Sequence, residues 1–277
     1  MLLQVDLTYL ELKHQKRCDA MNFFEDLQLV YKKAGQDTLL KIKKAPQFLI
    51  FPFIYGIIYT LGFFFIGNFL GMFLGGLMGF VTPLLTALIL SSYFSVLSDL
   101  IYYNRISFRN FSKTFMEYFA SIYSVFFILM IISFLMPGIG GAMGATTLVG
   151  ALITIALNPI AESIYIRGEY YTSAYTHSLE FMKENFLLWT IPFLIYLGIL
   201  HLLGFDFAMM ISSNSIVDIP LGENIMTGLS YLNPMDPYNI KVLIASIITA
   251  IYAIFRGNLY RILVGSTRRK RAYMGEL

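Results

Sequence analysis

The stretch APQFLIFPFIYGIIYTLGFFFIGNFLGMFLGGLMGFVTPLLTALILSSYFSVLS, residues 45–98, contains no charged side chain. A membrane-spanning helix needs roughly 20 apolar residues. This stretch is therefore long enough for two such helices joined by a tight turn. Gly67 and Asn68 are typical turn residues, and they predict helices near 46–66 and 69–98.

The overall composition also indicates a membrane protein. Of 277 residues, 57% are hydrophobic and 13% are charged, against roughly 45–50% and about 25% in soluble globular domains. The formal net charge of +3 is too small to indicate a nucleic-acid partner. The single cysteine, Cys18, excludes an internal disulfide and a metal site built of several thiolates.

Four further apolar segments complete a prediction of six spans. A second uncharged run is interrupted by Pro-Gly-Ile-Gly-Gly at 137–141, which predicts helices near 117–136 and 142–166. The fifth span is expected near 185–205 and the sixth near 239–263, from whose ends long basic side chains can reach the lipid headgroups.

The predicted fold is thus all-α: a polytopic integral membrane protein with six transmembrane helices and interfacial amphipathic helices. The expected organisation is a cytoplasmic N-terminal segment, a six-helix membrane domain with a long outer loop, and a basic cytoplasmic tail, at residues 1–45, 46–265 (loop 206–238) and 266–277.

Basic residues are distributed very unevenly over this topology. All but one of the 20 Lys and Arg residues fall on the side of the membrane that holds both termini, and Lys241 is the exception. The long outer loop contains acidic residues but no Lys or Arg. Because basic residues are retained in the cytoplasm, we expect an N-in, C-in orientation in the cytoplasmic membrane of a bacterial cell.

Three segments have the spacing of helices that lie along the membrane. Residues 21–44 have lysines near the membrane entry point and apolar side chains at helical intervals, namely Phe23, Phe24, Leu27, Val30, Tyr31 and Ala34. The loops after the second and fourth spans carry comparable faces, at Phe108, Phe111, Phe115 and Phe119 and at Tyr171, Ala174, Tyr175, Ser178 and Met182. A packed connector explains each of them. The alternative is a docking surface for a cytoplasmic partner, formed in the first loop by Arg105, Phe108, Arg109 and Phe111.

A glycine zipper is predicted at Gly67, Gly71, Gly75 and Gly79, which are spaced four residues apart. On one helix they would form a smooth face that a neighbouring backbone can approach closely. Packing of the second span against the fourth is the expected role. A homodimer interface or a groove for a lipid chain are the alternatives.

A polar cluster at the inner ends of the spans is one interpretation of Asp99, Glu162, Arg167 and Arg256. The alternative is that each residue marks a helix end in the headgroup region. Ionisable groups at this depth require partners or water. Asn158-Pro159 lies one turn before Glu162 and predicts a kink, because proline lacks a backbone N–H. No catalytic, metal-binding or cofactor-binding motif accompanies the cluster, so no catalytic residue, metal or cofactor is expected.

The stretch from Asn158 through Glu162 to Asn185-Phe186 resembles the multi-pass domain attached to some bacterial glycerophosphodiester phosphodiesterases, and related six-span bacterial proteins. The resemblance covers about residues 80–265. It implies a six-helix membrane domain. It implies no phosphodiesterase activity, because the catalytic domain of those enzymes lies outside the resemblance.

The order of segments is similar to that of permease subunits of type-2 ABC exporters, with an interfacial helix first, a coupling helix near 105–117 and an outer segment at 206–238. This architectural analogy implies a non-enzymatic, transport-related subunit for a hydrophobic or amphiphilic molecule. Its partners would be the lipid bilayer and a cytoplasmic ATPase or another membrane subunit. The alternatives are a membrane-embedded lipid-modifying enzyme and a scaffold or immunity protein that binds a partner.

The orientation is testable with thiol labelling. A cysteine introduced at Ser213, in the predicted outer loop, is expected to react with a membrane-impermeant maleimide in intact cells. Native Cys18 should react only after the cells are opened, because the N-terminal segment is predicted to be cytoplasmic. Labelling of Cys18 in intact cells would contradict this topology.

Overall fold

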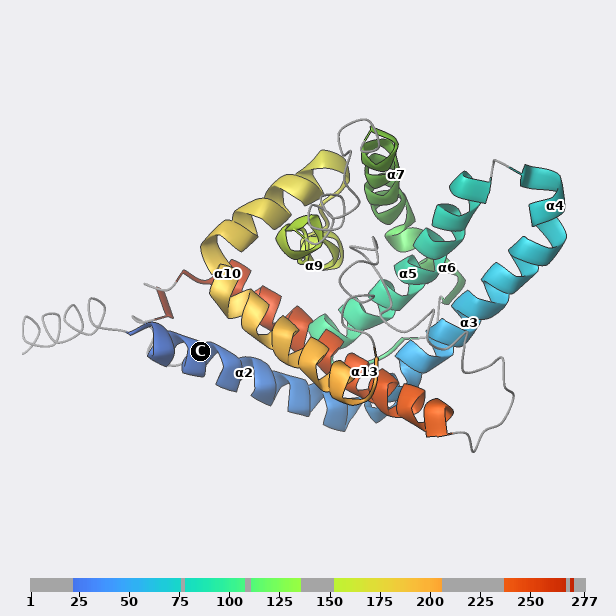
Figure 1. The fold of residues 1–277 in the computed structure, drawn as a ribbon. Helices are drawn as coiled ribbons and strands as arrows, with labels where there is room; N and C mark the ends of the chain where they lie inside the picture. The colour runs from blue at the N-terminus through green and yellow to red at the C-terminus, as the bar shows by residue number, and fades with distance from the viewer. Residues whose placement is uncertain are drawn as a thin grey trace, which may run out of the picture.

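The computed structural model describes residues 22–75, 78–107, 111–135, 152–205, 237–267 and 270–271, and these residues are helical with no strand among them (Figure 1). The α-helices are α2 (Phe23–Lys44), α3 (Phe51–Phe65), α4 (Gly71–Leu74), α5 (Met78–Tyr103), α6 (Phe111–Glu117), α7 (Phe119–Leu135), α9 (Ile160–Tyr165), α10 (Tyr171–Leu202) and α13 (Pro237–Gly265). A 3-10 helix, η1 (Pro46–Ile50), precedes α3, and a π-helix, η2 (Ile66–Leu70), joins α3 to α4.

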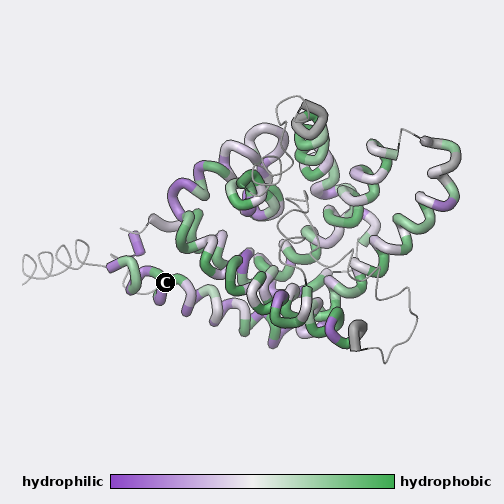
Figure 2. The backbone as a smooth tube through the Cα atoms, viewed as in Figure 1, coloured by the Kyte–Doolittle hydropathy of each residue, from purple (hydrophilic) through white to green (hydrophobic). Residues whose placement is uncertain are grey.

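Five helical segments are long and apolar enough to cross a membrane: Pro46–Phe69, Met78–Tyr103, Phe111–Ile131, Tyr171–Leu202 and Ile240–Gly265. The shortest has 21 residues, which at about 1.5 Å per residue matches a hydrocarbon core of about 30 Å. Figure 2 shows hydrophobic residues along all of them, whereas α2 and the start of α10 are mixed. The chain therefore has the architecture of a multi-pass membrane protein.

The predicted fourth span, 142–166, is represented by a shorter apolar helix at Leu152–Tyr165. Its first ten residues lie outside the described residues, as do 206–236 of the predicted outer loop.

The predicted turn at Gly67-Asn68 is wrong, because the helix continues through it. The π-helix η2 carries the chain from α3 into α4, and the Asn68 side-chain amide donates a hydrogen bond to the Phe64 carbonyl oxygen at 2.8 Å. The helix instead ends at Gly75, whose φ of 44° suits glycine because it has no Cβ. The second long helix consequently begins at Met78 rather than residue 69.

The predicted glycine zipper is not a single helix face. Gly67 and Gly71 precede the break at Gly75, whereas Gly79 follows it on α5. A Cβ placed at Gly67, Gly75 or Gly79 would meet no described atom within 4 Å. Four-residue spacing predicts a shared face only when one helix contains all the members, and here a helix end intervenes.

Among the described glycines, the most tightly enclosed is Gly257 on α13. A Cβ there would overlap Ile101 Cδ1 of α5 and lie 3.0 Å from the Tyr165 hydroxyl of α9. Gly62 of α3 is a second such position, with its Cβ 2.9 Å from Leu85 Cδ2 of α5. Gly257 thus permits three helices to meet in the centre of the bundle.

Helix α2 lies antiparallel along α13, as Figure 1 shows. Its buried residues recur every three or four positions, as one helix face: Asp26, Val30, Ala34, Thr38 and Lys41. Phe24, expected on the apolar face, is 72% exposed. One face of α2 therefore packs against the rest of the protein. Phe24, Leu39 and Leu40 project from its other faces.

Helix α10 changes direction at Asn185, as predicted for the start of the fifth span. Asn185 has non-helical angles (φ −123°, ψ 18°), and its side-chain amide donates to the Phe181 carbonyl oxygen at 3.2 Å. Before this kink, Ala174, Ser178 and Met182 of the predicted amphipathic face are buried.

A leucine at Gly257 should prevent close packing of α13 against α5 and α9. Overpacking typically costs about 1–3 kcal/mol, and more where backbone must move. Gly257→Leu is therefore expected to lower the melting temperature in detergent, or the yield of monodisperse protein. The matched control is Gly79→Leu, at an exposed position of α5, which should behave like the parent. Equal stability of both variants would contradict the packing described here.

Candidate functional site

The site begins at a break in the helix that leads into α9. Leu152 to Ala156 are helical, 157–159 form a turn, and α9 resumes at Ile160. Pro159 has no backbone N–H to donate, so the regular hydrogen-bond ladder is interrupted here. The predicted kink at Asn158-Pro159 is confirmed. The break leaves the Asn158 carbonyl oxygen available to a side chain.

Arg256 of α13 uses that carbonyl and the Glu162 carboxylate of α9 together. Its Nε donates to Glu162 Oε1 at 2.7 Å and its Nη2 to Glu162 Oε2 at 2.6 Å. Nη2 also donates to the Asn158 carbonyl oxygen at 2.7 Å. The two side chains are 17% and 4% exposed. This is a buried, bidentate ion pair, the geometry in which Arg and a carboxylate interact most strongly.

The pair lies well inside the length of its helix. Arg256 is nine residues before the end of the Ile240–Gly265 span, which corresponds to roughly 14 Å along the axis. A charged side chain at such depth is costly unless it is paired. Glu162 and the Asn158 carbonyl supply the partners that make the position tolerable.

Aromatic rings complete the environment of the guanidinium. Its central carbon lies 5.2 Å from the centroid of the Trp189 ring and 5.8 Å from that of Tyr252, within cation–π range. Trp189 Nε1 donates to Asn158 Oδ1 at 2.8 Å, which fixes the indole. Tyr252 is stacked on Tyr196 with centroids 4.1 Å apart. Arg256 is therefore held by α9, α10 and its own helix.

Buried hydroxyl groups extend this polar region across the bundle. Ser163 and Tyr260 share a hydrogen bond of 2.9 Å, and Tyr55 and Ser92 one of 2.8 Å. The Tyr93 hydroxyl is buried and forms no hydrogen bond with the described residues. The centre of an otherwise apolar bundle thus contains one ion pair and several tyrosines.

The structure brings together two of the four residues of the predicted inner-face cluster, Glu162 and Arg256. Arg167 lies elsewhere, with a 39% exposed side chain 3.7 Å from Glu169. Asp99 forms no ion pair with the other three in the described part of the chain, and interacts electrostatically with Glu117 and Arg105.

Sequence reasoning missed the residues that surround the pair. Trp189 and Tyr252 were not singled out. Two signals could have indicated them. Trp189 is the chain's single tryptophan, and Tyr252 precedes Arg256 by four residues, which places both on one helix face.

The predicted docking residues are only partly described. Phe108 and Arg109 lie outside the described residues. Arg105 is exposed after the end of α5, and Phe111 of α6 packs edge-on against Phe115 at 5.3 Å. Helix α6 is fixed to α5 by Ser91 Oγ, which donates to the Thr114 carbonyl oxygen at 2.9 Å.

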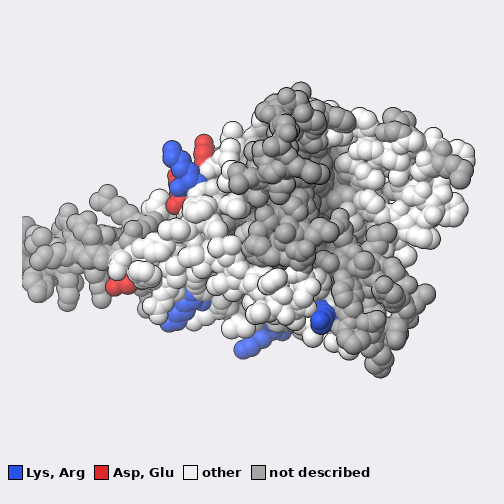
Figure 3. Space-filling model, viewed as in Figure 1, with Lys and Arg blue, Asp and Glu red and all other residues white. Residues whose placement is uncertain are grey.

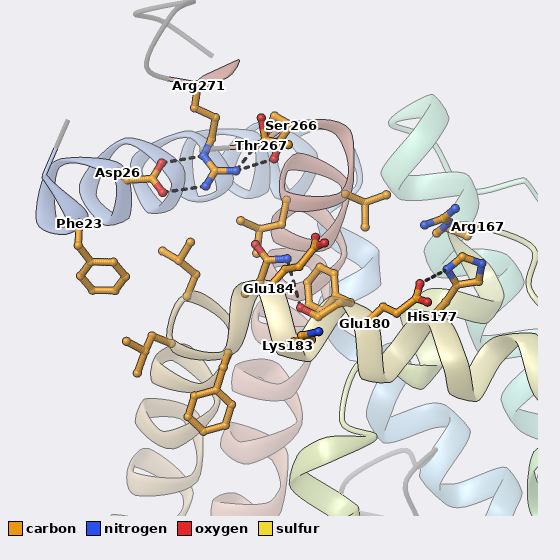
Figure 4. A pocket seen from close by; sticks show the side chains of 17 residues that line it. Phe23, Asp26, Arg167, His177, Glu180, Lys183, Glu184, Ser266, Thr267 and Arg271 are labelled. Atoms are coloured by element: carbon orange, nitrogen blue, oxygen red, sulfur yellow. Dashed lines mark hydrogen bonds and ion pairs between the residues drawn. The ribbon is translucent and has the colours of Figure 1, made fainter. Parts of the chain in front are cut away.

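A recess of about 710 Å³ lies between the start of α2, the kink of α10 and the end of α13 (Figure 4). At its edge Arg271 binds Asp26 through two hydrogen bonds of 2.7 Å, and both side chains are buried. Charged residues of both signs line the rest, including Arg167, Glu180 and Lys183. Because these charges are balanced, the recess has no clear preference for an ion of either sign.

No group of three His, Cys, Asp or Glu side chains within the described residues could hold a metal ion. No protein-family model, curated protein or solved structure matches the chain. The site is therefore interpreted from its own geometry.

Removing one member of the ion pair should destabilise the bundle more than removing both. Glu162→Gln and Arg256→Gln each leave an unpaired buried charge, at a cost of about 3–5 kcal/mol. The melting temperature should fall by on the order of 10 °C in either variant. In the double variant the loss should be clearly smaller than the sum, because no charge remains.

The fluorescence of Trp189 provides the measurement, since this single tryptophan contacts the guanidinium directly. Glu180→Gln is the matched control, because the Glu180 side chain is 72% exposed, and ion pairs at the surface contribute about 0–1 kcal/mol. Additive losses in the double variant would show that the two charges are not coupled.

Proposed function

We propose that this chain is a non-enzymatic, permease-like subunit that handles a hydrophobic or amphiphilic molecule. Its six spans lie in the cytoplasmic membrane of a bacterium, with both termini in the cytoplasm and with α2 and the first half of α10 along the inner surface. The observation that carries the proposal is the buried Glu162–Arg256 pair on a broken helix.

Broken helices and intramembrane charges are found where transporters bind and move their substrates. The break at Asn158-Pro159 provides a hinge, and Arg256 holds it through the Asn158 carbonyl oxygen. Release of Arg256 would free that carbonyl, the Glu162 carboxylate and the faces of two aromatic rings together. An element with two such arrangements is what alternating access requires.

An amphiphilic substrate matches the distribution of polarity around the site. The surrounding core is apolar, with Leu90, Leu97, Leu100, Ile160 and Ile164 all buried. The ion pair and the tyrosine hydroxyls supply a single polar region within it. A molecule with an apolar body and a compact polar group would be complementary to both.

The alternative of a lipid-modifying enzyme is less compatible with the geometry of Glu162. Both of its carboxylate oxygens accept hydrogen bonds from Arg256, at 2.7 and 2.6 Å. In this arrangement the carboxylate serves as the counter-ion of the guanidinium. The scaffold alternative explains the exposed loops but gives the buried pair no role.

An energised transporter also needs a source of energy, which we propose to be a separate cytoplasmic ATPase. Its docking surface would be the segment from Arg105 through Phe108, Arg109 and Phe111, with charge at the rim and aromatic rings at the centre. A second membrane subunit, or a second copy of the chain, could complete the permease.

Affinity purification from host membranes in mild detergent, followed by reconstitution into vesicles with a fluorescent phospholipid, tests this proposal. With ATP, the purified material should move the lipid between leaflets faster than protein-free vesicles do, as measured by dithionite quenching. The Glu162→Gln/Arg256→Gln double variant should be at least about tenfold slower, and Glu180→Gln, at an exposed position, should equal the parent. A parent that moves no lipid, and brings no ATPase with it, would refute the proposal.

A further inference from the structure

The second half of α2 contains an excess of positive charge that no described carboxylate balances. Lys41 is only 4% exposed. The charged groups that act on it are Arg261, Lys44 and Lys33, with Asp37 as the one acid. Figure 3 shows basic side chains along the lower edge of the molecule, where Figure 1 places α2.

Asp37 is already engaged by other cations. Its carboxylate oxygens lie 3.7 Å from Lys33 Nζ and 3.8 Å from Arg261 Nη2. Among the described residues the Lys41 ammonium group has no ion pair of its own. Burial, and then the nearby Arg261, lower the pKa of Lys41, which means that its charged form lacks adequate compensation.

The position of Arg261 is fixed as well. Its Nη1 donates to the Ile101 carbonyl oxygen at 3.0 Å, near the end of α5. About one turn earlier on α13, the side-chain amide of Asn258 donates a hydrogen bond to Thr38 Oγ1 at 3.2 Å. This bond holds α2 against α13. Arg261 and Lys41 are therefore presented by two helices that are tied to each other.

Exposed apolar side chains project from other faces of the same turn of α2. Leu39 is 60% exposed and Leu40 is 53% exposed, directly before Lys41 in the sequence. The first membrane-spanning segment begins a few residues later at Pro46, and Ile50 within it is 48% exposed. The positive cluster thus adjoins the surface where lipid chains must cover the protein.

We infer that Lys41 and Arg261, with Lys44 beside them, bind the phosphate of an anionic phospholipid, whose acyl chains cover Leu39 and Leu40. Arg and Lys together are the usual ligands of phosphate oxygens, with Arg donating in a fixed fork and Lys acting as a compact charge. Basic clusters beside a membrane helix attract anionic lipids. The apolar neighbours favour a lipid over free phosphate. This site does not depend on the proposed transport function.

Native mass spectrometry and thermal unfolding of the full chain, with added phosphatidylglycerol or phosphatidylcholine, test the inference. The parent should retain phosphatidylglycerol and be stabilised by it, and phosphatidylcholine should have a much weaker effect. Lys41→Gln should bind phosphatidylglycerol about tenfold more weakly, the loss expected for one charge-assisted contact. It should still fold, because the substitution removes a poorly compensated buried charge.

Lys32→Gln is the matched control, because Lys32 is exposed on the same helix and is not among the groups that act on Lys41. Arg261→Lys should retain more binding than Arg261→Gln. Equal losses in Lys41→Gln and Lys32→Gln would reduce the effect to diffuse attraction and overturn the site. Competition by millimolar inorganic phosphate that matches phosphatidylglycerol would overturn the assignment to a lipid.

Discussion

Every polar group inside a membrane must find its partner within the protein, because the hydrocarbon core contains no water to supply one. The Glu162–Arg256 pair satisfies this constraint for three groups. The carboxylate neutralises the guanidinium, and the guanidinium satisfies the Asn158 carbonyl oxygen, which lies in the turn where the helix breaks. The broken helix and the buried charge are therefore one feature. Neither would be stable at this depth without the other.

Helix α13 connects this feature to most of the bundle. Along its length it presents Arg256 to α9, Gly257 to the crossing of α5 and α9, Asn258 to α2, and Arg261 to the end of α5. Beyond its end, Arg271 binds Asp26 and fixes the other end of α2. Helices α2 and α13 are thus joined at two points about a dozen residues apart. They are expected to move as one body.

The features that sequence reasoning predicted correctly are those that depend on the cost of burying charge. Uncharged runs located the first and third long helices and, apart from its start, the second. Asn158-Pro159 located the break. The depth of Glu162 and Arg256 indicated that each needed a partner, and the structure pairs them.

The incorrect predictions concern residues whose sequence pattern is compatible with several local structures. Glycine in an apolar segment fits a turn, a helix end or a packing face equally well. Of the glycines described between residues 62 and 79, Gly75 is the one with a positive φ, and it ends the helix. The buried face of α2 includes polar side chains, so the periodicity of hydrophobic residues alone does not predict it.

The two polar sites follow the same physical rule at different depths. At Arg256 the compensating carboxylate is internal, so the charge is neutralised within the bundle. At Lys41 the one described acid that acts on it is Asp37, and the proposed lipid phosphate would supply a second negative charge. Arg256 is a residue of α13, and Lys41 is a residue of α2, which packs against α13.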